Sequence, residues 1–171
     1  EVEPDIVLLG KGLGNGVPVS AAVGRRDVFE SLGYGEASDT WSANPLSSAA
    51  VLATLDEFES TDALSQGLHL AGIIEAGLVR LKETEVISKV RGEGCVWGIE
   101  CADLNGHSGA EVANQVIEKC YQGQDGALAI HLLGALAGKV LRISPPLTMC
   151  PEECQSYLDR LFEVCQEVAT I

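Results

Sequence analysis

The first part of the chain alternates short apolar runs with loops rich in glycine. The apolar run at residues 6–9 ends at Gly10, a pattern typical of a buried strand in a parallel sheet. Residues 19–23 form a second apolar run, closed by Gly24, and predict a second strand. Residues 27–32 predict a single helical turn. This pattern predicts that the chain begins with a piece of parallel α/β structure.

Two helices are predicted next. Asn44 and Pro45 form a favourable helix start, because an asparagine side chain caps the first turn and proline fits the first helical position. This helix is predicted to end near Phe58. Its predicted buried face comprises Val51, Leu52 and Leu55. A second helix is predicted from about Ser60, with apolar residues at helical spacing: Leu64, Leu68, Ala71, Leu78 and Leu81.

The remaining pattern mixes strands and helices. Residues 86–101, "VISKVRGEGCVWGIEC", predict two strands joined by a glycine turn. Residues 108–111, "SGAE", have the residues of a capping box and predict the start of a helix. Short strands are predicted near residues 128–131 and 140–144, and a last helix from Pro151.

The long second helix suits a connector between two lobes, and we place the domain boundary inside it. Residues 1–65 then form an incomplete α/β lobe, and residues 66–171 form an α+β lobe. Because the first lobe has so few strands, we expect an open sheet edge that invites pairing with another chain.

Composition narrows the possible functions. The 171 residues are 46% hydrophobic and 21% charged, as in ordinary globular proteins. Acidic residues number 25 against 11 basic ones, a formal net charge of −14, which argues against a nucleic-acid partner. No apolar run is long enough for a transmembrane span, so no membrane association is expected.

The cysteines argue for a reducing environment. They are scattered, and none forms a C-x-x-C pair, so no zinc site or other metal site is predicted. A chain of this length has no need of disulfides, and we expect free thiols and a cytoplasmic location. The six are Cys95, Cys101, Cys120, Cys150, Cys154 and Cys165.

The most unusual stretch is "LLGKGLGNG" at residues 8–16, where Lys11 lies among glycines. It is not a P-loop, because the lysine precedes most of the glycines and Gly12 follows it. Lys11 comes directly after a predicted strand, where ligands bind in open α/β sheets. A partly desolvated lysine there suits covalent catalysis. A flexible surface loop is the alternative that the residue types leave open.

Four segments in order carry a family resemblance. They are "PDIVLLGKGLGNGVPVSAAVGRRDVF", "TWSANPLSSAAVLATL", "VRGEGCVWGIE" and "LRISPPLTM". Together they resemble class III aminotransferases, the family of ornithine, acetylornithine and 4-aminobutyrate aminotransferases. The resemblance implies a fold-type I pyridoxal 5′-phosphate enzyme, in which this chain corresponds to the end of the large domain plus the C-terminal small domain.

The resemblance also implies roles for three residues. Lys11 falls on the lysine that forms an aldimine with pyridoxal phosphate and moves the substrate proton. Thr40 falls on the threonine that donates to the cofactor phosphate across a dimer interface, and Arg142 on the arginine that binds the substrate carboxylate. The implied partners are an amino donor, either an amino acid or an ω-amine, a 2-oxo acid acceptor, and a second copy in a homodimer or other homo-oligomer.

Three features set this chain apart from the family pattern. Trp41, Ser42 and Ala43 follow the threonine, where family members usually carry an aromatic residue and then glycines. Asp39 precedes the threonine and adds a negative charge near the implied phosphate site, and Cys150 takes a helix-cap position often held by threonine or serine. The family's phosphate loop and its aspartate for the pyridine nitrogen lie upstream of the lysine. The resemblance therefore implies that the 171-residue chain alone has no, or very weak, aminotransferase activity. A non-catalytic assembly or binding module is one alternative, and a decarboxylase, racemase or aminomutase of the same family is another.

Overall fold

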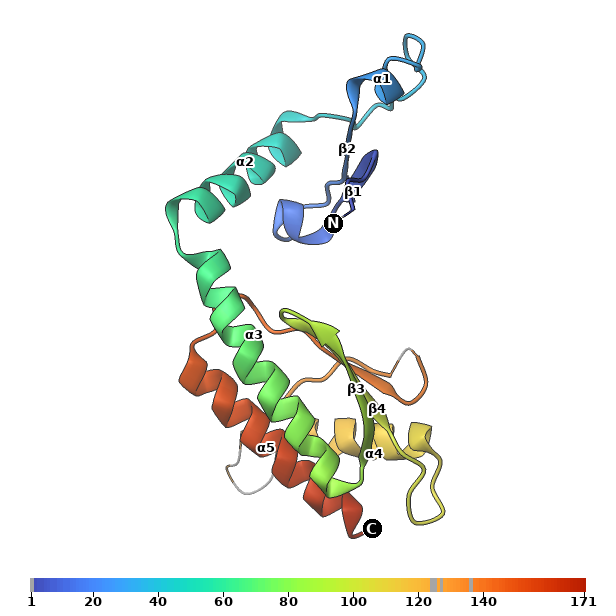
Figure 1. The fold of residues 1–171 in the computed structure, drawn as a ribbon, viewed down its shortest axis with the longest axis vertical. Coiled ribbons are helices and arrows are strands. Elements are labelled where there is room, and N and C mark those ends of the chain that lie inside the picture. The colour runs from blue at the N-terminus through green and yellow to red at the C-terminus, as the bar shows by residue number, and fades with distance from the viewer. Residues whose placement is uncertain (1, 124–125, 127, 136) are drawn as a thin grey trace. The chain divides into compact units, whose positions relative to one another are not determined.

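The computed structural model describes residues 2–123, 126, 128–135 and 137–171. The chain forms two compact units, Glu1–Asp62 and Ala63–Ile171, and the division falls between two helices, α2 and α3 (Figure 1). Each unit has its own small sheet, and each is described by itself.

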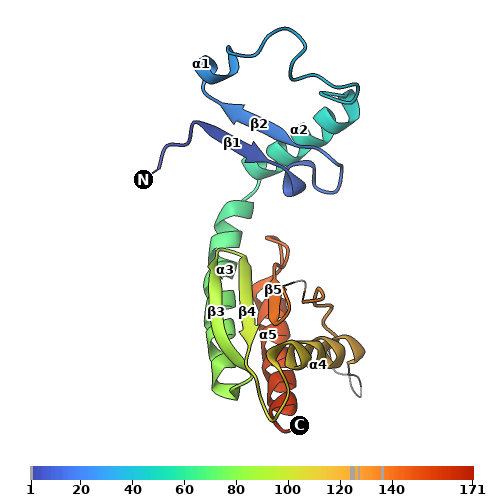
Figure 2. The ribbon, with the colours of Figure 1, turned by 90° about the vertical axis from the view of Figure 1, so that its right-hand side faces the viewer.

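The first unit is built on a two-stranded ribbon and one long helix. Strand β1 pairs antiparallel with β2, with Val7 opposite Val23 (Figure 2). The expectation of a parallel sheet was therefore wrong for these two strands. The elements are β1 Ile6–Leu9, the 3₁₀ helix η1 Lys11–Gly14, β2 Ala21–Gly24, α1 Arg26–Phe29 and α2 Pro45–Ser60.

Burial in the first unit is low. All four residues of β1 are exposed, and Leu8 keeps 80% of its surface in contact with solvent. A two-stranded ribbon offers too little surface to bury such a strand, so the predicted burial of β1 was wrong. The predicted buried face of α2 was wrong for Leu52 and Leu55, which are 61% and 45% exposed.

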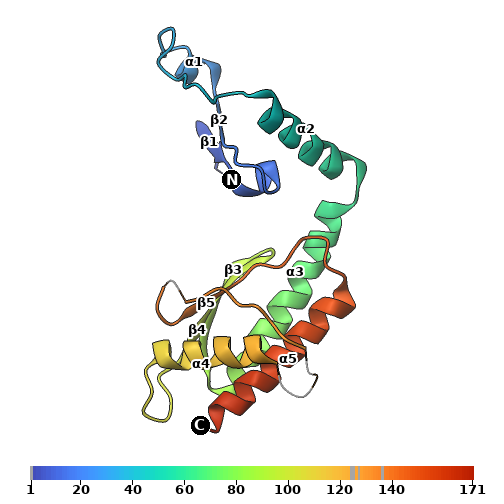
Figure 3. The same ribbon diagram turned by 180° about the vertical axis from the view of Figure 1, so that it is seen from behind.

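The second unit packs three helices with a three-stranded antiparallel sheet of order β3-β4-β5. The predicted hairpin is confirmed, with Val90 opposite Ile99, and Ile99 in turn lies opposite Leu141 of β5. Helices α3 and α5 lie side by side (Figures 1 and 3). The elements are α3 Ala63–Arg80, the 3₁₀ helix η2 Leu81–Thr84, β3 Ile87–Glu93, β4 Val96–Cys101, α4 Gly109–Gln122, β5 Val140–Ile143 and α5 Pro151–Ala169.

One expectation for the second unit was wrong. The described residues 128–131 form no strand; instead the Ile130 N–H donates to the Cys120 carbonyl at 2.7 Å, at the end of α4. Of the apolar residues that predicted helix α3, Leu78 is fully buried, as is Leu81 directly after the helix. Leu64 and Leu68 are exposed, because the stripe that meets the sheet and α5 comprises Gly67, Leu70, Ile74 and Leu78.

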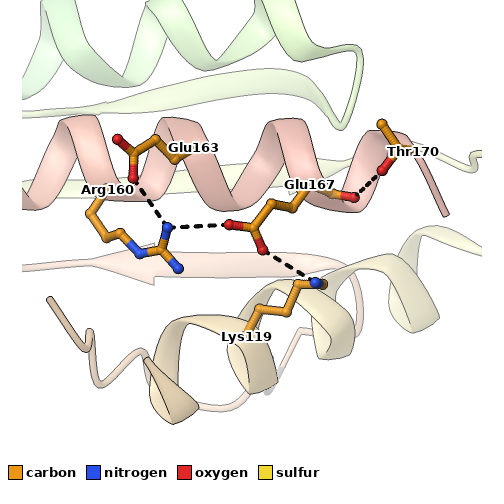
Figure 4. Close-up of polar contacts among 5 residues, drawn as sticks. All are labelled: Lys119, Arg160, Glu163, Glu167 and Thr170. Atoms are coloured by element: carbon orange, nitrogen blue, oxygen red, sulfur yellow. Dashed lines mark hydrogen bonds and ion pairs between the residues drawn. The ribbon is translucent and has the colours of Figure 1, made fainter. Parts of the chain in front are cut away.

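A charged network ties α5 to α4 (Figure 4). Arg160 is 8% exposed, and its Nη1 donates to Glu163 at 3.1 Å and to Glu167 at 3.2 Å. Glu167 also accepts a hydrogen bond from Lys119 of α4 at 3.2 Å. The Nε and Nη2 atoms of Arg160 are buried and have no hydrogen-bond partner among the described residues. The network therefore leaves part of a buried guanidinium unsatisfied.

All six cysteines are free thiols, and five are buried. Burial raises the pKa of Cys101 to about 11 and that of Cys120 to about 12, so these thiols stay protonated and pack as apolar groups. In the described part of the chain, no helix combines the length and the apolar character needed to cross a membrane.

Candidate functional site

Lys11 follows β1 directly and opens the short helix η1. Gly10 before it is extended, and Lys11 itself has a φ of +50°, in the left-handed region that non-glycine residues rarely adopt. The turn closes through hydrogen bonds from Leu13 N–H to the Gly10 carbonyl and from Asn15 N–H to the Gly12 carbonyl, both 3.1 Å. The side chain is exposed, so the partial burial expected for this lysine is not observed.

Lys11 lines an open hollow of about 1200 Å³ within the first unit. The other walls are residues 16–20, which lead into β2, the loop 39–44, and the first turns of α2. Four serines, Ser20, Ser42, Ser47 and Ser48, are among the lining residues. A primary amine and several polar side chains around a space of this size suit a small polar ligand.

The start of α2 is fixed by Asn44, as the sequence predicts. Its side-chain oxygen accepts the Ser47 N–H at 3.0 Å, and its amide nitrogen donates to the Trp41 carbonyl at 3.0 Å. The Ser47 hydroxyl in turn donates to the Pro18 carbonyl at 3.4 Å, which joins α2 to the segment after Lys11. Sequence reasoning missed Ser47, because no local pattern reveals a contact with a residue so distant in the chain.

Asp39 places a carboxylate on the wall of the hollow. Its Oδ1 accepts the N–H groups of Trp41 and Ser42 at 2.7 and 2.9 Å, and its Oδ2 accepts the Ser42 hydroxyl at 2.8 Å. The hydrogen bond from the Ser42 side chain is the largest of the effects that hold the pKa of Asp39 below its ordinary value. Asp39 therefore remains charged at neutral pH. Its oxygens already accept the two N–H groups and the hydroxyl that would otherwise be available to a bound anion.

Thr40 stands between Asp39 and Trp41, both of which line the hollow. Its side chain is exposed, and its hydroxyl has no hydrogen-bond partner among the residues that the structure describes. The hydroxyl is thus free to donate to a ligand near the N-terminus of α2, where helix N–H groups favour anions.

Arg142 belongs to the second unit. It lies on β5 opposite Gly98 of β4, and Ser144, Pro145 and Pro146 follow it. The guanidinium is exposed and lines two pockets of about 500 Å³ each. One pocket lies against α5, and the other lies beside Arg91 and Trp97.

The comparisons with known proteins agree on one family. The sequence profile of class III aminotransferases matches residues 1–165. The leucine/methionine racemase of Thermococcus litoralis is 35% identical over 170 residues, with 98% of this chain and 37% of the racemase covered. The acetylornithine aminotransferase of Oceanobacillus iheyensis is 33% identical over 169 residues, with 98% and 39% covered.

A solved structure matches as well. The ornithine aminotransferase of Toxoplasma gondii, with partial occupancy of pyridoxal phosphate at its active site, superimposes with a TM-score of 0.84 at 29% identity. The match covers 99% of this chain and 38% of that enzyme. The chain therefore belongs to the class III aminotransferase family and has the fold of the corresponding part of these enzymes. It spans between 35 and 39% of the length of the curated relatives that head the comparison.

Proposed function

We propose that this chain supplies the cofactor-binding lysine and the carboxylate-binding arginine of a pyridoxal-phosphate enzyme. The enzyme transfers an amino group from an amino acid or ω-amine to a 2-oxo acid. The observation that carries the proposal is the position of Lys11, directly after β1 and on the wall of an open hollow that also contains the start of α2.

The residues of this chain have distinct roles in the proposal. Pyridoxal phosphate, when bound, supplies an electron sink for the electrons left at the substrate α-carbon. The Lys11 amine holds the cofactor and then moves the proton at that carbon. The Thr40 hydroxyl donates to a phosphate oxygen, and Arg142 binds the substrate carboxylate through two parallel hydrogen bonds.

The proposal extends to the organisation of the protein. Residues 1–65 are the end of the cofactor-binding large domain, and residues 66–171 are the small domain. The protein acts in the cytoplasm as a homodimer or other homo-oligomer, in which Thr40 serves the partner's cofactor. Exposed apolar side chains on α2, among them Leu46 and Leu52, support an interface there.

We further propose that the 171 residues alone are inactive or nearly so. Asp39 is the one acidic residue among the described residues that line the hollow, and its oxygens already accept three hydrogen bonds. A pyridine nitrogen therefore finds no free carboxylate there to keep it protonated, which weakens the electron sink.

The test is a labelling experiment on the folded chain. Pyridoxal phosphate is added, the adduct is reduced with borohydride, and the modified lysine is identified by peptide mass spectrometry. We expect Lys11 to be labelled at the lowest cofactor concentrations and Lys11→Ala to lose the saturable visible absorbance. Lys89, an exposed lysine on β3, is the matched control. Equal labelling of Lys11 and Lys89 would contradict the proposal.

Amino-acid racemisation is the second candidate, favoured by the 35% identity to the leucine/methionine racemase. A racemase returns the proton to either face of the α-carbon and releases no 2-oxo acid. With the whole enzyme, chiral chromatography of a single-enantiomer amino acid together with an assay for 2-oxo acid distinguishes the two reactions.

A further inference from the structure

The second unit contains a mainly apolar pocket, whose lining also includes His131, Arg142, Ser144 and Tyr157. Its volume is about 500 Å³, within the range of pockets that bind small molecules. The walls come from Ile74 of α3, residues 129–133, the residues that follow Arg142, and the buried Leu158 and Leu161 of α5. Every wall belongs to the second unit, so this pocket depends on no other part of the chain.

Charge sets this pocket apart from the rest of the surface. The chain has 25 acidic residues, and none of those in the described part of the chain lines the pocket. An anion in the pocket therefore meets no carboxylate among the described lining residues, in a protein whose net charge is strongly negative.

Arg142 is the permanent cation at this pocket, and it is available. In the described part of the chain it has neither an ion pair nor a hydrogen bond, whereas each of the other five arginines pairs with a carboxylate. Those five are Arg25, Arg26, Arg80, Arg91 and Arg160. An unpaired guanidinium at the edge of an acid-free apolar pocket suits a carboxylate that carries an aliphatic tail.

We infer that this pocket binds an aliphatic monocarboxylate, with the carboxylate on Arg142 and the tail between α3 and α5. The inference rests on the proposed role of Arg142 and names the substrate class: amino acids and 2-oxo acids with apolar side chains. A second carboxylate finds no further permanent cation among the described lining residues, so dicarboxylates bind weakly.

The experiment measures binding to the full 171-residue chain by calorimetry, without cofactor. The probes are 4-methyl-2-oxopentanoate, pyruvate and 2-oxoglutarate. We expect 4-methyl-2-oxopentanoate to bind at least about tenfold more tightly than pyruvate, because its additional carbons are buried. Arg142→Gln weakens its binding roughly tenfold, the effect of losing charge-assisted hydrogen bonds. Ala129→Trp, at an exposed position of the lining, blocks the pocket while Arg142 remains.

Arg91→Gln is the matched control, because Arg91 is exposed and lines the other pocket at Arg142. Three results would overturn the inference. The first is loss of 4-methyl-2-oxopentanoate binding in Arg91→Gln, the second is unchanged binding in Arg142→Gln or Ala129→Trp, and the third is equal affinity for the three probes. The binding measurement uses no cofactor, so its outcome does not depend on the lysine labelling. A failure of the lysine labelling and a failure of the pocket are therefore separate results.

Discussion

Asp39 adds a fixed negative charge to the wall of the Lys11 hollow. Its carboxylate takes up the N–H groups of Trp41 and Ser42, the type of backbone donors that bind anions in turns. The lowered pKa of Asp39 keeps its charge in place at neutral pH. The chain thus supplies its own anion at the place where the proposal needs a phosphate.

We expect Asp39→Ser to strengthen the binding of inorganic phosphate to the chain. Removal of one like charge at close range in water is worth about 1 kcal/mol, which corresponds to roughly a fivefold gain in affinity. Phosphorus NMR titration measures the dissociation constant. Glu36→Gln is the matched control, because Glu36 lies in the same segment and does not line the hollow. Unchanged affinity in Asp39→Ser would show that the carboxylate does not compete with the anion.

At the scale of elements, the contact between α4 and α5 includes one buried charge, Arg160, beside its apolar core. We expect Arg160→Met to leave the free energy of unfolding unchanged or to raise it, because two buried nitrogens of Arg160 lack partners and an apolar side chain of similar length needs none. Glu167→Ala is expected to lower it by roughly 1–3 kcal/mol, since Lys119 and Arg160 both lose an acceptor. Urea unfolding followed by circular dichroism measures both changes.

The same network predicts a pH dependence. Burial alone would raise the pKa of Glu167, but hydrogen bonds from Lys119 and Arg160 outweigh it and lower the pKa overall. A carboxyl whose folded pKa is depressed stabilises the fold above its ordinary value of 4.5, and this contribution is lost as the pH falls below that value. We expect Glu167→Gln to lose less stability than the wild type between neutral pH and pH 4, as measured by thermal unfolding. If the stability of the two proteins falls equally with pH, the network is not the cause of the pH dependence.

Helix α4 begins with a complete capping box. Ser108 accepts the Glu111 N–H, and the Glu111 carboxylate accepts the Ser108 N–H at 2.7 Å. We expect Ser108→Ala to lower the free energy of unfolding by about 1 kcal/mol. Ser156→Ala, in the interior of α5, is the control and should change it by less than about 0.5 kcal/mol. A Ser108→Ala protein as stable as the control would show that α4 does not depend on its cap.

The elements that were predicted correctly from the sequence are those whose starts are marked by nearby residues. The starts of α2, α4 and α5 follow from Asn44, Ser108 and Pro151, because a cap acts within a few residues of itself. Burial was predicted less well, since it depends on what packs against a helix. Leu52 of α2 is apolar and helically spaced yet exposed, because the described residues of the first unit offer no surface that covers it.

The candidate site shows the same division between local and distant information. The lysine loop was recognised from its glycines and from the strand before it, while the contact of Ser47 with the Pro18 carbonyl joins residues far apart in the chain and has no sequence signal. Asp39 was visible in the sequence only as a charge beside Thr40, and its hydrogen bonds with Trp41 and Ser42 required the structure.

At the scale of the whole molecule, the two units differ sharply in what holds them together. The connected core of buried apolar residues lies entirely within the second unit, from Leu70 on α3 to Val168 on α5. In the first unit the large apolar side chains of β1 and α2 are mostly exposed. Because buried apolar area is the main favourable term in folding, the second unit is expected to carry most of the stability of the chain.

Hydrogen exchange of the full chain tests this difference directly. We expect the amides of α3, β4 and α5 to exchange only through global unfolding of the second unit, and those of β1, β2 and α2 to exchange orders of magnitude faster through local opening. Ile99→Ala, which empties a fully buried position on β4, should destabilise the second unit by roughly 2–5 kcal/mol and accelerate exchange there. The first unit should be unaffected, because it shares no core with Ile99. Equal protection of the two units, or acceleration of both by Ile99→Ala, would mean that they unfold as one.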